Sequence, residues 1–209
     1  MIPRFSLYLF DVDGTLLDSA ADICGAIQGA LAGTAHANCE ESLLRSYIGR
    51  HLFELFGDLF PGCGPERMEA LLAEYRRIYL GRGHARTRLY PGVLESLASL
   101  PGNKATATTK GTPTTRAVLE QFGLLPYFHH VQGTDDFPAK PAPDVILRSI
   151  EHFHAPLDQV LMVGDSAADM EAGRRAGVRT CAVRYGYGNE ADLARHAPDY
   201  WIDDLRQLS

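Results

Sequence analysis

The sequence has no long hydrophobic run and no leader-like beginning. No apolar stretch approaches the roughly 20 residues that a transmembrane helix needs. No basic segment followed by an apolar one precedes the first predicted strand at residues 7–10. We therefore expect neither a membrane span nor a secretory signal, and we interpret the chain as cytoplasmic.

Cysteine pairs and excess positive charge are also missing. The four cysteines show neither a C-x-x-C pair nor metal-like spacing, so we expect free thiols in a reducing compartment. The formal net charge of -6 offers no basic surface for the phosphate backbone of a nucleic acid. No Gly-x-Gly-x-x-Gly follows the first strand, which disfavours a pure dinucleotide-binding module. An anionic ligand would have to be held by local groups.

What the chain does contain is a pair of aspartates directly after its first apolar segment. Asp11 and Asp13 follow the apolar residues 7–10, and Gly14 comes next. In an extended segment, residues two apart point to the same side, so both carboxylates can address one reacting atom. Gly14 lets the backbone turn away closely. This arrangement indicates a nucleophile assisted by a metal ion.

The pattern of apolar residues divides the chain into two kinds of region. Residues 18–86 carry helical spacing throughout, with no evident strand. From residue 90 onward, predicted strands at 105–108, 130–132, 160–164 and 180–183 alternate with predicted helices. That alternation is typical of a parallel sheet with helices on both faces. We expect an open α/β core made of residues 1–17 and 87–209, interrupted by a helical insertion at 18–86.

Chemically interesting residues follow four of the predicted strands. The segments are residues 11–13, 108–110, 140–141 and 164–169. Because ligands of open α/β sheets bind beyond the carboxyl ends of the strands, we expect these segments to meet. They combine acids, a hydroxyl and a lysine, which phosphoryl transfer through an aspartyl phosphate requires.

The same segments suggest a magnesium site. Asp11 and Asp165 supply hard oxygen ligands for Mg²⁺, with Asp169 as a further candidate. Lys140, one of only three lysines in the chain, would stabilise the charged phosphoryl group.

In their order, these segments resemble the four motifs of the haloacid dehalogenase-like (HAD) phosphatase superfamily, and the resemblance covers nearly the whole chain. Residues 13–19, 108–110, 140–144 and 184–188 are similar to its phosphoglycolate phosphatase-like branch. The resemblance implies a Rossmann-like parallel sheet core with an inserted α-helical cap domain. It also implies Mg²⁺ as cofactor and a small phosphorylated metabolite as substrate.

The resemblance assigns roles to individual residues. Asp11 is the nucleophile, and Asp13 protonates the leaving alcohol and then activates water. The family's Mg²⁺ contacts the side chains of Asp11 and Asp165 and the backbone carbonyl of Asp13. Thr108, Thr109 and Lys140 bind the phosphate. Asp169 either orients Lys140 or a metal-bound water, or is simply an acid at a helix N-terminus.

One position departs from the pattern of the branch. Thr109 stands where asparagine is usual, and a hydroxyl can replace only part of the hydrogen bonding of an amide. The departure concerns fine positioning of phosphate or substrate and leaves the reaction class unchanged.

Several functions on the same fold compete with a phosphatase. A dehalogenase has no need for Asp13, and a phosphonate hydrolase uses a cap lysine that residues 18–86 lack. Sugar-phosphate mutases tend to carry histidine where this chain has Ile23, but they stay open, as do a pyrophosphatase and a non-catalytic phospho-ligand-binding protein.

Substrate specificity is expected to lie in the helical insertion. Arg45 and Arg50 flank a segment similar to the part of the cap that faces the active site, and either can pair with a carboxylate of the substrate. The physiological phosphate ester and the oligomeric state are not predicted.

Overall fold

A five-stranded parallel sheet forms the centre of the computed structural model, which describes residues 2–208. Its strand order is β4 (Asn103–Thr106), β1 (Leu7–Phe10), β5 (Val160–Gly164), β6 (Arg179–Val183) and β7 (Tyr200–Ile202). Every neighbouring pair is parallel, and the last residue of β1 pairs with Thr106 on one side and Val163 on the other. The carboxyl ends of β4, β1 and β5 therefore lie level at one edge of the sheet.

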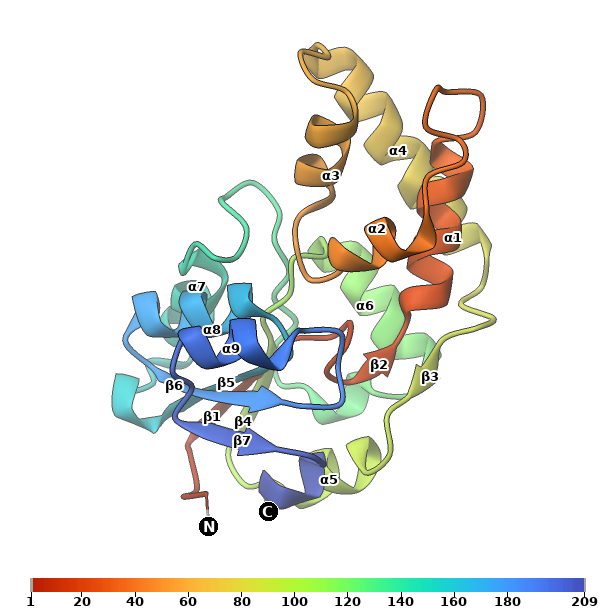
Figure 1. The fold of residues 1–209 in the computed structure, drawn as a ribbon. Helices are drawn as coiled ribbons and strands as arrows, with labels where there is room; N and C mark the ends of the chain where they lie inside the picture. Colours follow the sequence, from red (N-terminus) through yellow and green to blue (C-terminus); the bar gives the residue numbers. More distant parts are fainter. Residues whose placement is uncertain (1, 209) are drawn as a thin grey trace.

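Helices cover both faces of this sheet (Figure 1). The helices that follow β3 are α5 (Val93–Ser99), α6 (Thr112–Gln121), α7 (Asp144–Phe153), α8 (Ala167–Ala176) and α9 (Glu190–Arg195). Single 3₁₀ turns lie at η1 (Leu125–Tyr127), η2 (Leu157–Gln159) and η3 (Leu205–Leu208).

Alternate residues of β1 pack into different layers, as a strand buried on both faces requires. Leu7 and Leu9 lie in a cluster with Val145 of α7 and Ala172 of α8. Tyr8 and Phe10 lie in the larger cluster, which also contains residues of α5, α6 and η3. All four residues of β1 are fully buried, so this strand is the central element of the core.

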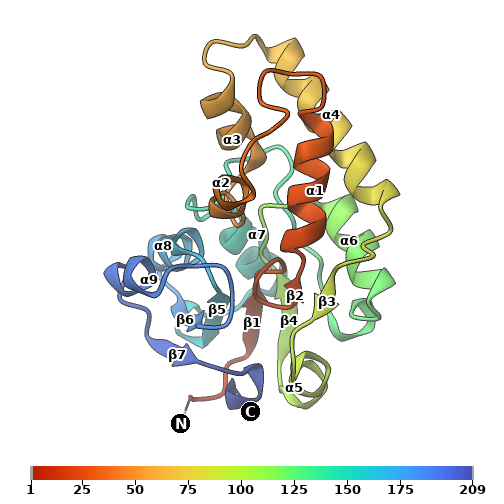
Figure 2. The same cartoon turned by 45° about the vertical axis from the view of Figure 1, so that its right-hand side comes forward.

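Four helices stand together above the carboxyl edge of the sheet, at the opposite end of the molecule from the chain termini (Figures 1 and 2). They are α1 (Ala20–Ala30), α2 (Glu41–Ser46), α3 (Leu52–Leu59) and α4 (Pro65–Gly81). The chain enters and leaves this group through β2 (Leu17–Asp18) and β3 (Arg88–Leu89), which pair antiparallel. Asp22 of α1 reinforces that junction, because its carboxylate accepts hydrogen bonds from the Arg86 amide and the Thr87 hydroxyl.

The expected strand at residues 130–132 is wrong. Only an isolated bridge joins His130 to Ala105 there. The reason is that the Thr106 side chain takes the place of the backbone ladder, since its hydroxyl donates to the Gln132 carbonyl and accepts from the Gln132 amide, both at 2.9 Å.

Short elements near the C-terminus were not predicted from the sequence. These are the edge strand β7, which pairs only with β6, and the six-residue helix α9. Neither is long enough to show a clear periodicity.

The helices and the cysteines agree with the expectations on membrane spans and thiols. Within residues 2–208, every helix is either too short or too polar to cross a lipid bilayer. Cys24, Cys39, Cys63 and Cys181 are free thiols, as expected.

Candidate active site

The four motif segments meet around the ammonium group of Lys140. This group donates to Asp11 Oδ1 at 2.7 Å, to the Ala107 carbonyl at 2.8 Å, and to Asp169 Oδ1. Lys140 is fully buried. Burial alone would lower its pKa, but the charges of Asp11 and Asp169 raise it above the ordinary value of a lysine. Lys140 is therefore a fixed cation between two carboxylates.

Three carboxylates gather at this point, with one oxygen of each of Asp11, Asp165 and Asp169 lying within 4.8 Å of the others. Burial raises the pKa of Asp11 to about 7, with the charges of Asp169 and Asp13 adding to the rise and Lys140 opposing it. Burial and the charges of Asp11 and Asp169 likewise raise the pKa of Asp165. Three acids facing one ammonium group leave excess negative charge.

That charge and geometry fit a divalent cation. Asp11 Oδ2 is buried and has no hydrogen-bond partner among residues 2–208, so it is a free acceptor. Hard cations of the Mg²⁺ type prefer carboxylate oxygens, and each of the three acids offers one within 4.8 Å of the others. The residues present therefore suit a metal ion that would also relieve the repulsion among the acids.

Glycine residues pack closely around the side chain of Asp165. A Cβ added to Gly14, whose φ is +94°, would lie 2.2 Å from Asp165 Oδ2, and one added to Gly186 would lie 2.2 Å from Asp165 Cβ. Only glycine allows this approach. Asp165 is also held by the Thr15 hydroxyl at 3.3 Å and the Tyr187 amide at 2.7 Å. The carboxylate is thus fixed in one orientation.

Asp169 contacts both the start of α8 and Lys140. One oxygen accepts from the amide and hydroxyl of Ser166, and the Asp169 amide donates back to that hydroxyl, forming a capping box at the start of α8. The other oxygen accepts from Lys140. The helix N-terminus therefore fixes the acid that in turn orients the lysine.

Asp13 is directed away from the acidic cluster. Its Oδ1 accepts from the Ser19 hydroxyl at 2.6 Å, and its Oδ2 lies 3.1 Å from Lys110 Nζ. Burial alone would lower the pKa of Lys110, but the charge of Asp13 raises it above the ordinary value. Asp13 also lines a cavity that Asp11, Asp165 and Asp169 do not line.

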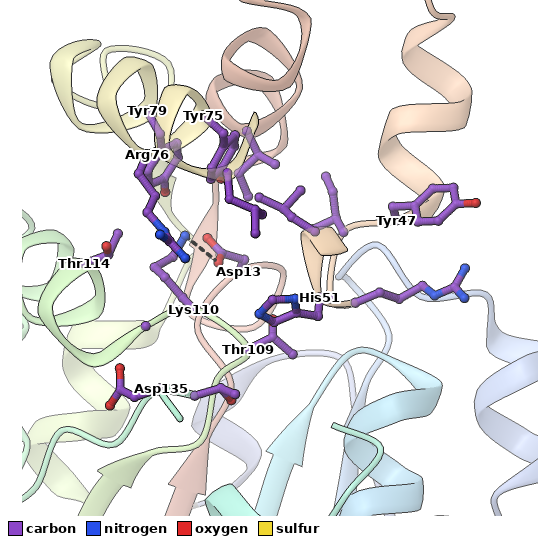
Figure 3. A pocket seen from close by; sticks show the side chains of 18 of the residues that line it. Asp13, Tyr47, His51, Tyr75, Arg76, Tyr79, Thr109, Lys110, Thr114 and Asp135 are labelled. Carbon is purple, nitrogen blue, oxygen red and sulfur yellow. Dashed lines mark ion pairs between the residues drawn. The ribbon is translucent and has the colours of Figure 1, made fainter. Parts of the chain in front are cut away.

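The two threonines of the second motif differ in environment. Thr108 is buried, and its hydroxyl accepts from the Lys110 amide at 3.3 Å. Thr109 lines the cavity next to Lys110 (Figure 3).

The cavity has a volume of about 1020 Å³ and lies between the helices α1 and α4 and the loops that follow the sheet. Figure 3 shows Tyr75, Arg76 and Tyr79 of α4 reaching toward Lys110 and Asp13. Ile23 and Ile27 of α1 add an apolar wall.

The two arginines considered for specificity are placed differently. Arg50 lines the cavity, but its guanidinium pairs with Glu54 at 2.7 Å and lies over the Tyr47 ring. Arg45 is not among the lining residues and pairs with Glu41 at 3.2 Å. The structure does not bring Arg45 to the cavity.

Sequence reasoning gave no role to Ser19, Lys110 or Tyr187, all of which contact the candidate site. The Tyr187 hydroxyl accepts from the amides of Ser19 and Ala20 at 2.6 and 2.9 Å and donates to Asp18. Tyr187 therefore connects Asp165 to the start of α1. The glycines on either side of Tyr187, directly after a predicted strand, are the one signal that marked a close backbone approach.

We expect Tyr187→Phe to lower the free energy of unfolding by about 1–3 kcal/mol, because two amides at the start of α1 lose their acceptor. Urea unfolding measures this change. The matched control is Tyr200→Phe, since the Tyr200 hydroxyl has no hydrogen bond to residues 2–208. Equal losses in both variants would show that the Tyr187 hydroxyl does not hold α1.

A family model and several known proteins match most of this chain. The family model described as haloacid dehalogenase-like hydrolase matches residues 8–183. Phosphoglycolate phosphatase 1 of Pseudomonas aeruginosa is 36% identical over 217 residues, covering 99% of this chain and 79% of the relative. The phosphoglycolate phosphatase of Vibrio vulnificus is 34% identical over 216 residues, covering 98% of this chain and 95% of the relative.

The fold has close counterparts among solved structures. A crystal structure described as a predicted phosphoglycolate phosphatase from Haemophilus somnus superposes with a TM-score of 0.87 at 27% sequence identity. The match covers 100% of this chain and 98% of the other. The α/β fold expected from the sequence is therefore confirmed.

Proposed function

Because this chain belongs to the haloacid dehalogenase-like hydrolases, as its motifs indicated, we propose that it hydrolyses a small phosphate monoester through a phosphoaspartyl intermediate on Asp11. One observation carries the proposal: Asp11 is buried with one oxygen on Lys140 and the other unpartnered. Such an oxygen is oriented and free to attack.

The first half of the reaction transfers the phosphoryl group to the protein. The free oxygen of Asp11 forms a bond to phosphorus, and the bond between phosphorus and the alcohol oxygen breaks. Asp13, which faces the cavity, gives its proton to that oxygen, so the leaving group departs as a neutral alcohol. The Thr108 hydroxyl donates to an oxygen of the transferred group, and the nearby positive charge of Lys140, whose three donors are engaged, stabilises the negative charge of that group.

The second half reverses these roles. Asp13 accepts a proton from water, the water oxygen bonds to phosphorus, and the bond to Asp11 breaks. Inorganic phosphate leaves and both aspartates return to their starting state. Ser19, which donates to Asp13 Oδ1, keeps the acid aimed at the leaving oxygen in both halves.

A divalent cation, for which we propose Mg²⁺, would be held by the side chains of Asp11 and Asp165 and the backbone carbonyl of Asp13, with Asp169 beside it. When bound, it supplies positive charge that neutralises the phosphate and the crowded acids. The glycines packed around Asp165 keep that carboxylate in place for this task.

Residues 18–86 act as a cap in this proposal, and residues 1–17 and 87–209 act as the catalytic core. The cavity between α4 and the core loops supports this division, because the leaving group would sit under helices that the chain enters and leaves through β2 and β3. Closure of such a cap excludes water and completes the site.

Phosphoglycolate is proposed as a substrate because the relatives with 36% and 34% identity carry that name. The test is release of inorganic phosphate from phosphoglycolate, p-nitrophenyl phosphate and a panel of phosphorylated metabolites. Turnover of none of them, by folded protein supplied with Mg²⁺, would refute the phosphatase proposal.

We expect activity to depend strictly on Mg²⁺. Removing the metal with EDTA should lower turnover at least about a hundredfold, since metal stabilisation of transition-state charge is worth several kcal/mol. Ca²⁺ should inhibit, because its longer bonds and larger ligand number let Asp11 coordinate in a non-attacking geometry. Steady-state rates after dialysis measure both effects, with Mg²⁺ re-addition as the control. Full activity in EDTA would contradict the expectation.

A further inference from the structure

Lys110 is a buried cation that lines the cavity. It has no role in the proposed reaction. Its ammonium lies 3.1 Å from Asp13 Oδ2 and 4.2 Å from the centre of the Tyr79 ring, and only 9% of its side chain is exposed. Asp13 is the one ion-pair partner that residues 2–208 provide. An ammonium group has three donors, so Lys110 can bind a second anion.

The backbone of Lys110 is held firmly. Its amide donates to the Thr108 hydroxyl at 3.3 Å, and its carbonyl accepts from the Thr134 amide at 3.0 Å. With the Tyr79 ring against the ammonium, the side chain has a defined position.

That position is next to the leaving group. The proposed acid Asp13 must contact the ester oxygen, and Lys110 contacts Asp13 from the cavity side (Figure 3). With hydrogen bonds of about 3 Å on each side of Asp13, the ammonium lies within reach of a group one carbon away from the ester oxygen. A carboxylate attached to that carbon would be its natural partner.

The other cations around the cavity are already engaged. Arg50 pairs with Glu54 at 2.7 Å, and Arg76 pairs with Glu69 at 3.2 Å. Both guanidinium side chains are about half exposed, at 47% and 53%, so water weakens what they can add. Among the lysine and arginine side chains that line the cavity, that of Lys110 is the one shielded from solvent.

We propose that Lys110 selects the substrate by binding the carboxylate that phosphoglycolate, the proposed substrate, carries on the carbon next to its ester oxygen. The proposal rests on the proposed phosphatase function, and it assigns carboxylate recognition to the core rather than to Arg45 or Arg50. The helix α4 contributes Tyr79, whose ring lies against the ammonium group of Lys110.

The test compares two esters of the same size. Phosphoglycolate carries the carboxylate, and 2-hydroxyethyl phosphate carries a neutral hydroxyl in its place. We expect Lys110→Met to lower kcat/KM for phosphoglycolate by about one to two decades, since a charge-assisted hydrogen bond is lost. The preference for phosphoglycolate over 2-hydroxyethyl phosphate should fall by about the same factor, because any change at Asp13 affects both esters alike.

Two further variants separate recognition from general damage. Lys110→Arg keeps the charge and should retain most of the preference for phosphoglycolate. Arg50→Ala removes an exposed cation from the same cavity and should leave the preference unchanged. Equal losses on both esters in Lys110→Met, or loss of the preference in Arg50→Ala, would overturn the assignment to Lys110.

Binding measured by calorimetry tests the inference independently of turnover. Phosphoglycolate should bind the double variant Asp11→Asn, Lys110→Met about one to two decades more weakly than it binds Asp11→Asn, which cannot hydrolyse the ester. Weakened binding, together with no release of phosphate by the unaltered chain from any ester of the panel, would uphold Lys110 and refute the phosphatase proposal. Unchanged binding, together with normal hydrolysis by the unaltered chain, would refute the role of Lys110 and uphold the phosphatase proposal.

Discussion

Asp11→Asn is expected to abolish turnover, by about four orders of magnitude or more, because an amide cannot form the acyl phosphate. The fold should survive, since Lys140 keeps Asp169 and the Ala107 carbonyl as partners. Removing one of three crowded carboxylates also reduces their repulsion. Release of inorganic phosphate measures activity, and a thermal unfolding curve measures the fold.

The matched control is Asp158→Asn, the same chemical change at an exposed position in η2. It should leave both activity and the thermal midpoint unchanged. If Asp11→Asn kept a near-normal midpoint and more than about a tenth of the original activity, the nucleophile would have to be another residue.

Lys140→Met is expected to lower the free energy of unfolding by about 3–5 kcal/mol, because it leaves the Asp11 and Asp169 carboxylates buried without their cation. Activity should fall as well, since the same ammonium orients Asp11 and its charge is proposed to stabilise the transferred phosphoryl group. Urea unfolding in EDTA measures the stability change without interference from a bound metal.

Lys104→Met serves as the control for that variant. Lys104 is also buried, but its ammonium donates to the Gly102 carbonyl rather than to carboxylates. Its replacement should cost only about 0.5–1.5 kcal/mol, the value of one ordinary hydrogen bond. Similar costs for the two variants would mean that the pairing of Lys140 with the acids does not stabilise the fold.

The placement of Asp11 and of the segment 164–169 was predictable from the sequence because it depends on strand order and little else. Lys140 reaches the same edge from a loop, because only an isolated bridge forms at the strand expected before it. Once residues 7–10 and 160–164 are recognised as buried parallel strands, the residues that follow them must emerge at the same edge of the sheet. Asp11, Lys140, Asp165 and Asp169 do meet there. Apolar periodicity likewise indicated the helices of residues 18–86.

The side-chain partners at that edge were not predictable. Residues 130–132 were expected to form a strand, yet a hydroxyl from Thr106 replaces the ladder. Arg45 and Arg50 look equivalent in the sequence, but only Arg50 lines the cavity.

By itself, then, the sequence determined the α/β fold, the family and the set of acids that gather at the sheet edge, because these follow from periodicity and chain order. Only the tertiary structure decided that Lys110 lies against Asp13 and that Tyr187 joins Asp165 to α1. Those contacts join loops separated by up to about 170 residues. The conformations of the loops and the packing of the helices on the sheet set the geometry of these contacts. Neither can be predicted from a local pattern of residues.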